Sequence, residues 1–252
     1  MKIERAQALF RELDNLLGKE RVFEYVVETD YAKGERWTRA KKNEEAADRV
    51  SAVTGDIVHN LRSALDHAFW DVVSPHVPER EHKRIQFPYA KDESRWPKEL
   101  QTRFADCVSN GFYDYVKSLN VFSGSGGGGA LALLHEMDIQ DKHKFPLPVG
   151  DFTKLHSSDI IPYVHDFPGG IHGMSFGRNN KDVLWKVPSR KRPKDKKSDC
   201  AAERLSCRIL PINIDVCFAF GSGNKLCLIT ATLSSMIDDV ANVVAEIFKY
   251  KK

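Results

Sequence analysis

The sequence predicts an α+β protein, with helices in its first part and strands in its second. Apolar residues recur at helical spacing up to about residue 146, whereas they alternate with polar residues between 212 and 220. A regular strand–helix–strand repeat is not evident in the pattern. We therefore expect a helical core at 1–146 and a β-rich region closed by a helix at 147–252, packed as one globular unit.

The first elements predicted are a helix, a hairpin and a long helix. Residues 3–17 place their apolar side chains on one side, before a glycine that ends the helix. Residues 21–29 and 36–41 flank a turn, which predicts an N-terminal β-hairpin insertion. The long helix is expected from Glu44 to Val73, because a Ser-Pro pair follows it. Its predicted core side consists of Val50, Val53, Ile57, Leu61, Ala64, Ala68 and Val72.

Two more helices are predicted before residue 146. Apolar residues at helical spacing indicate one helix over Leu100–Leu119 and another over Ala130–Lys144. A flexible glycine-rich break at 123–129 is expected to separate them. The connection at 75–98 is rich in proline and charge, so no regular element is expected there.

The C-terminal part is expected to contain a hairpin and a closing helix. The alternation from Ile212 to Phe220 predicts a half-buried strand, and the glycine-rich turn at 221–224 predicts a returning strand at 226–231. Ser234 or Ser235 is expected to cap the last helix.

Composition limits the class of protein. The chain has 252 residues, is 42% hydrophobic and carries a net charge of +3, which is too mild to indicate nucleic-acid binding by itself. No apolar run approaches the roughly 18 residues of a membrane span, and the first residues lack a signal-peptide core. Five widely spaced cysteines without a Cys-x-x-Cys pair indicate reduced thiols, so we expect a cytoplasmic protein.

The polar side chains of the long predicted helix do not scatter over its surface. At about 100° per residue, five of them fall in one stripe opposite the core side, with two more along its border. An indole is poorly placed on a face that meets only water, so we expect another helix or a second copy of the chain to cover this stripe. The stripe consists of His59, Arg62, Ser63, Asp66 and Trp70, with Asn60 and His67 at its border.

The helix predicted at 130–144 carries polar residues at matching offsets. If the two helices pack side by side, Arg62 can pair with Asp138 and Lys142 with Asp66. One interpretation is therefore a non-catalytic structural or interaction protein, in which these residues form a salt-bridge layer between helices or between two subunits. The set on the second helix is His135, Asp138, Lys142 and His143, which repeats the spacing of His59, Arg62, Asp66 and His67.

Two motifs in these helices resemble one family. The segments HNLRSALDH, at 59–67, and LHEMDIQDKHK, at 134–144, are together similar to a group of uncharacterised bacterial proteins with an HNLRSALDH helix and a later helix ending in Asp-Lys-His-Arg/Lys. The resemblance covers residues 1–145, including the hairpin between the first two helices. It implies no established activity.

Arg62-Ser-Ala-Leu-Asp-His67 also resembles, more loosely, the Arg-x4-His motif of the HEPN superfamily, whose members include metal-independent ribonucleases of toxin and phage-defence systems. The resemblance implies a HEPN-like bundle, completed as a homodimer, without a cofactor and with RNA as substrate and an antitoxin or other protein as partner. Arg62 would bind the scissile phosphate and His67 would exchange the proton. Ser63 departs from the motif, since active members commonly have Asn, Asp or His there. Supporting residues would be His59, Asp66, His135, Asp138, Lys142 and His143. A metal-independent endoribonuclease is our leading hypothesis.

A metal site is the third interpretation of the same residues. Imidazole and carboxylate groups on two helices could bind Zn, Mn or Fe. Arg62 and Lys142 lie in the same stripes, however, and their charges would repel a cation. The ligands would come from His59, Asp66, His67, His135, Asp138 and His143.

A strongly basic run occupies residues 189–197. Such a run can bind an RNA backbone electrostatically, whereas a solvated hairpin tip is the default interpretation. Its cationic residues are Arg190, Lys191, Arg192, Lys194, Lys196 and Lys197.

Overall fold

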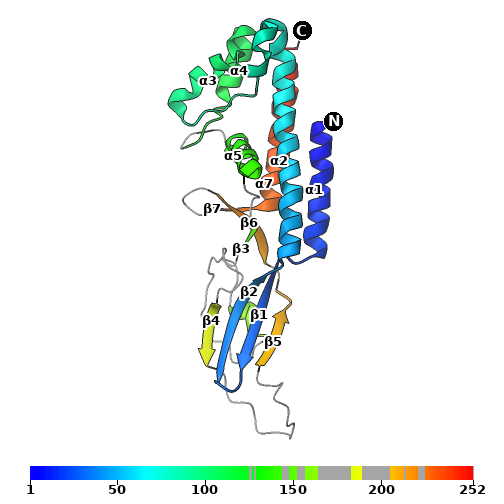
Figure 1. Ribbon diagram of the computed structural model, residues 1–252, viewed down its shortest axis with the longest axis vertical. Helices are drawn as coiled ribbons and strands as arrows, with labels where there is room; N and C mark the ends of the chain where they lie inside the picture. The colour runs from blue at the N-terminus through cyan, green and yellow to red at the C-terminus, as the bar shows by residue number, and fades with distance from the viewer. Residues whose placement is uncertain are drawn as a thin grey trace. The chain divides into compact units, whose positions relative to one another are not determined.

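The computed structural model shows a mixed α and β protein, as predicted (Figure 1). It describes residues 1–124, 127, 129–143, 148–151, 157–163, 183–188, 205–212, 214–220 and 225–251.

The chain divides into two compact units. A helical unit comprises Met1–Asn15, Ser51–Pro146 and Thr230–Lys252, and a sheet unit comprises Leu16–Val50 and Leu147–Ile229. The two units are defined by which residues pack together, and the N-terminal hairpin belongs to the same unit as the later strands. The division of the chain into 1–146 and 147–252 stays a prediction.

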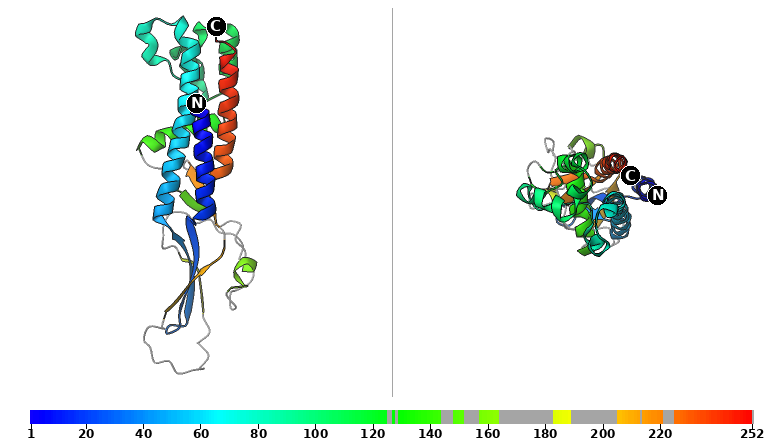
Figure 2. Two further views of the ribbon diagram at one scale, coloured as in Figure 1. Left: turned by 90° about the vertical axis from the view of Figure 1, so that its right-hand side faces the viewer. Right: turned by 90° about the horizontal axis from the view of Figure 1, so that it is seen from above.

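The helical unit is built around three helices that run side by side in both views (Figures 1 and 2). These are α1 (Lys2–Lys19), α2 (Glu44–Val73) and α7 (Ile229–Phe248). The predicted bounds of α2 are confirmed. Its predicted core side is buried except at Val53, which is half-buried. Burial extends further round the helix than predicted and includes Val58, Leu65 and Phe69.

The predicted helix over Leu100–Leu119 is wrong, because the structure has two helices there. α3 (Trp96–Thr102) and α4 (Asn110–Ser118) are separated by a 3₁₀ turn at Ala105–Cys107. The break begins at Phe104, whose φ of 67° lies in the left-handed region and cannot continue a right-handed helix. Ser109 then starts a new helix, since its Oγ accepts a hydrogen bond of 3.2 Å from the amide of Phe112.

The connection after α2 contains three short 3₁₀ turns, at Ser74–His76, Glu79–Arg84 and Glu93–Arg95. The fourth predicted helix is confirmed as α5 (Gly129–His143). Parts of the predicted glycine-rich break, residues 125, 126 and 128, lie outside the described residues.

The sheet unit contains the predicted N-terminal hairpin, formed by β1 (Phe23–Asp30) and β2 (Glu35–Lys42). β4 (Val183–Pro188) and β5 (Leu205–Leu210) extend it to a four-stranded antiparallel sheet in the order β4-β2-β1-β5. One face of this sheet is shielded from solvent. The buried residues on this face are Tyr25, Val27, Thr29 and Thr38.

A second sheet has the order β3-β6-β7, with β3 at Pro148–Asp151, β6 at Asp215–Phe220 and β7 at Lys225–Leu228. β6 and β7 pair as the predicted hairpin, although β6 begins three residues after Ile212 and the turn at 221–224 lies outside the described residues. A short helix, α6, covers Ser157–Ile160.

The predicted start of the last helix is wrong. α7 begins at Ile229, so Ser234 and Ser235 are exposed residues inside the helix and do not cap it. Buried Ile229, Leu233 and Met236 continue the helical spacing back to the first residue. None of the helices within the described ranges is long and apolar enough to span a membrane.

Candidate functional site

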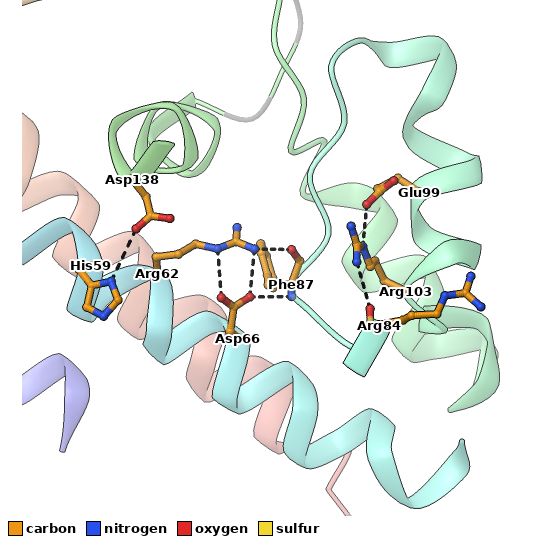
Figure 3. A network of polar contacts seen from close by, with 8 residues as sticks. All are labelled: His59, Arg62, Asp66, Arg84, Phe87, Glu99, Arg103 and Asp138. Atoms are coloured by element: carbon orange, nitrogen blue, oxygen red, sulfur yellow. Dashed lines mark hydrogen bonds and ion pairs between the residues drawn. The ribbon is translucent and has the colours of Figure 1, made fainter. Parts of the chain in front are cut away.

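The guanidinium of Arg62 makes three hydrogen bonds within the helical unit (Figure 3). Its Nε donates to Asp66 Oδ2 at 3.3 Å and its Nη2 to Asp66 Oδ1 at 3.0 Å. The two residues are one turn apart on α2, so the carboxylate lies within reach of the guanidinium fork. The same Nη2 also donates to the backbone carbonyl of Phe87 at 2.7 Å. Arg62 is therefore bound both to its own helix and to the segment that contains Phe87.

Asp66 completes this arrangement by binding the other polar group of the same residue. Its Oδ1 accepts a hydrogen bond of 2.9 Å from the amide of Phe87. Arg62 and Asp66 together therefore satisfy both the N–H and the C=O of Phe87, as the neighbouring strand of a sheet would. We call this arrangement the Phe87 clamp.

The clamp fixes an extended connecting segment, residues 85–90. Ile85, Phe87 and Ala90 of this segment are buried. The ring of Phe87 packs edge-on against Phe69 of α2, with centroids 6.0 Å apart, and lies 5.8 Å from the guanidinium carbon of Arg62. Apolar packing and the polar clamp hence act on the same residue from two sides.

Helix α5 holds the same segment through Tyr89. The Tyr89 hydroxyl lies 2.5 Å from Ser123 Oγ, which donates to Glu136 Oε1 at 2.5 Å. The Tyr89 ring also stacks on the imidazole of His135, with centroids 3.7 Å apart. Segment 85–90 is thus bonded to α2 through Phe87 and to α5 through Tyr89.

A direct polar contact also joins α2 to α5. His59 Nδ1 lies 3.8 Å from Asp138 Oδ1, and the Asp138 carboxylate is nearly buried whereas the His59 side chain is exposed. The predicted Arg62–Asp138 pair is wrong, since Arg62 pairs within its own helix. The predicted partner of Lys142, Asp66, is occupied by Arg62 and Phe87. The side chains of Lys142 and His143 lie outside the described residues.

The remaining predicted residues of the α2 stripe do not join this network. His67 is exposed, and Trp70 is 43% exposed with its ring edge-on to His82 at 5.8 Å. No described element of the same chain covers these two residues, so their cover by a second copy stays a prediction. The stripe is buried at Arg62, which is 8% exposed as a whole residue, and it is exposed to solvent at Trp70.

Several residues of the network were missed by sequence reasoning. Phe87 and Tyr89 lie in a connection without helical or strand periodicity, and Ser123 borders the glycine-rich break. Glu136 lies on α5 next to His135, but the predicted polar set did not include it. The one signal in the sequence was the pair of aromatic residues around Pro88, which is unusual in a solvated connection.

The metal interpretation finds no support in the described part of the chain. Among the described side chains, no group of three or more His, Cys, Asp or Glu residues is placed to hold a metal ion. The basic run at 189–197 lies outside the described residues. The strands on either side of this run are described. Pro188, the last residue of β4, pairs with Glu35, and Leu205, the first residue of β5, pairs with Asp30. Glu35 and Asp30 both lie next to the turn of the β1–β2 hairpin.

Comparison with known protein families, with curated proteins and with solved structures finds no match for this chain.

Proposed function

We propose that this chain is a non-catalytic structural or interaction protein, in which the polar residues of α2 and α5 hold segment 85–90 in place. The observation that carries the proposal is the state of Arg62. Its guanidinium makes three hydrogen bonds inside the protein, and its side chain is only 10% exposed. This use favours a structural role, because the Nε and Nη2 donors of the guanidinium are already bound to Asp66 and Phe87 and only Nη1 is left for another ligand.

The proposal predicts different effects for substitutions at two neighbouring residues of the HNLRSALDH motif, Asp66 and His67. Replacing Asp66 by Asn removes the negative charge that Arg62 faces, so Asp66→Asn should lower the Tm by several degrees, on the scale of about 2–4 °C per kcal/mol for a chain of this size. His67 is exposed and has no part in the clamp. His67→Ala should therefore leave the Tm within about 2 °C of the wild type.

The matching activity measurement uses the purified full chain and a mixed-sequence RNA in excess EDTA. In the proposed role the wild-type protein leaves this RNA intact. Cleavage that persists in EDTA and is lost in His67→Ala, at unchanged Tm, would overturn the proposal.

A HEPN-like metal-independent endoribonuclease is the second candidate, and the exposure of His67 favours it. An exposed imidazole is accessible to a substrate and can donate or accept a proton. In this candidate Arg62 binds a phosphate through Nη1, and the basic run from Arg190 to Lys197 adds electrostatic binding of RNA. The HEPN-like bundle, the RNA substrate, the antitoxin partner and the cytoplasmic location belong to this candidate and stay predictions.

A further inference from the structure

Residues 105–119, which contain the 3₁₀ turn at Ala105–Cys107 and α4, lie between two strained positions of the backbone. Phe104 has a φ of 67° and Asn120 has a φ of 49°, and within the described chain these are the two non-glycine residues with a positive φ. Residues with a Cβ rarely adopt this region, so such a backbone persists only where the surrounding packing holds it. The structure therefore places strain at both ends of one segment.

Helix α4 lies beside the end of α2 (Figure 1) and packs on it through a buried aromatic ring. Phe112 is fully buried, and its ring centroid lies 5.7 Å from that of Phe69 on α2. Phe69 in turn packs edge-on against Phe87. The polar bonds of the Phe87 clamp come from Arg62 and Asp66, so these bonds do not depend on α4.

The segment that follows α7 contacts the same ring of α4 through Tyr250. The Tyr250 ring packs edge-on against Phe112, with centroids 5.4 Å apart, and stacks on Tyr115 at 6.3 Å. Its hydroxyl donates a hydrogen bond of 3.3 Å to the carbonyl of Gly111. One side chain from outside the strained segment therefore contacts α4 at three residues.

Tyr250 is itself anchored to the three-helix core. The amides of Tyr250 and Lys251 donate to the carbonyls of Ile247 and Phe248, which extends the end of α7. Lys251 Nζ also lies 2.7 Å from Asp71 Oδ2 on α2. Tyr250 thus has a fixed position from which its ring holds α4.

We infer that residues 105–119 form a hinged flap that Tyr250 keeps closed. The hinges are Phe104 and Asn120, which return to a common backbone conformation when the flap opens. The aromatic contacts with Tyr250 oppose this relaxation and favour the closed state. Opening uncovers Phe69 of α2 beside the clamped segment. The inference concerns α4 and does not depend on the proposed function.

Opening of the flap also breaks a hydrogen bond to α3. Trp96 Nε1 donates to the backbone carbonyl of Lys117, 2.9 Å away. This carbonyl belongs to the last turn of α4, where water can replace the indole once the flap is open. The bond therefore adds to the stability of the closed state without preventing opening.

Hydrogen exchange followed by mass spectrometry on the full wild-type chain tests the flap. The amides of α4 should exchange at least about tenfold faster than those of the buried part of α2, residues 57–69. Exchange in α4 should hardly change in low urea, because opening a short segment exposes little surface, whereas exchange in α2 should follow global unfolding. Equal rates with equal urea dependence would mean that the two helices unfold together, and the flap would be refuted.

Substitutions of Tyr250 test what keeps the flap closed. Tyr250→Ala should raise exchange in α4 by at least about tenfold and exchange in residues 57–69 by less than about threefold, because only the flap loses its contacts. Tyr250→Phe keeps the ring and loses the bond to Gly111, so exchange in α4 should rise by less than about threefold.

Phe248→Ala is the matched control for these variants. It removes an aromatic ring that is 41% exposed from the same end of α7, so exchange in α4 should stay within about twofold of the wild type. Unchanged exchange in α4 of Tyr250→Ala, or an equal rise in α2, would overturn the proposal. The same holds if Phe248→Ala opens α4 as much as Tyr250→Ala does.

Discussion

The ring of Tyr89 lies stacked on the imidazole of His135, 3.7 Å away, and this contact connects the two polar helices through a third element. Phe87, two residues earlier, is bonded to Arg62 and Asp66 of α2. The two polar stripes predicted from the sequence therefore contact each other through segment 85–90, and His59 also approaches Asp138 directly.

The clamp makes the shape of the Arg62 side chain more important than its charge. Arg62→Lys keeps the positive charge, but an ammonium group has a single nitrogen. It cannot make both the two-pronged bond to Asp66 and the bond to the Phe87 carbonyl in the geometry of the guanidinium. We expect it to lower the free energy of unfolding by about 1–3 kcal/mol in urea titration.

Arg49→Lys is the matched control for this measurement. Arg49 binds Glu45 and Glu20, but its side chain is 42% exposed. Ion pairs at the surface contribute little, so the change should stay within about 0.5 kcal/mol. Equal losses in the two variants would show that Arg62 acts as a surface charge.

The hydroxyl of Ser123 joins Tyr89 to Glu136, and this chain of hydrogen bonds should be cooperative. Ser123→Ala and Tyr89→Phe should each destabilise the protein by about 1 kcal/mol, because each leaves a half-buried partner without its bond. In the double variant the losses should fall short of their sum by about 0.5 kcal/mol or more in urea titration. Strictly additive losses would contradict the coupling.

Much of the fold could be predicted from the spacing of apolar residues in the sequence. The site could not, because its contacts join residues that no regular spacing relates. The long helix and the N-terminal hairpin were predicted because their patterns are local. The break at Phe104 was missed, since its left-handed backbone depends on packing, including the Arg84 guanidinium 5.0 Å from its ring. The contacts of Arg62 and Asp66 with Phe87 were not predicted, because the residues that cover Arg62 lie in an aperiodic segment.

The left-handed backbone of Asn120, after α4, gives a test of strain. Its φ is 49°, a conformation that Asn and Gly tolerate better than other residues. Asn120→Ala should therefore cost about 1 kcal/mol of unfolding free energy, whereas Asn120→Gly should change it by less than about 0.5 kcal/mol. The opposite order in urea titration would show that the Asn side chain itself, and not the backbone, stabilises this turn.

Alkaline pH should destabilise the helical unit through Tyr115 of α4. Burial raises the pKa of Tyr115 from 10.0 to about 12, with further contributions from Glu246 and Tyr250 of the C-terminal segment. A raised pKa means that the unfolded chain loses this proton at a lower pH than the folded chain does. The stabilisation is therefore complete below pH 10 and is lost as the pH rises towards 12.

Tyr115→Phe removes the titrating group and keeps the ring, so its Tm should fall less steeply than that of the wild type over this alkaline range. Burial also raises the pKa of Tyr25 in the sheet unit, so Tyr25→Phe in both backgrounds isolates the contribution of Tyr115. Identical slopes of Tm against pH for Tyr115→Phe and the wild type would mean that Tyr115 ionises equally readily in the folded and unfolded chains.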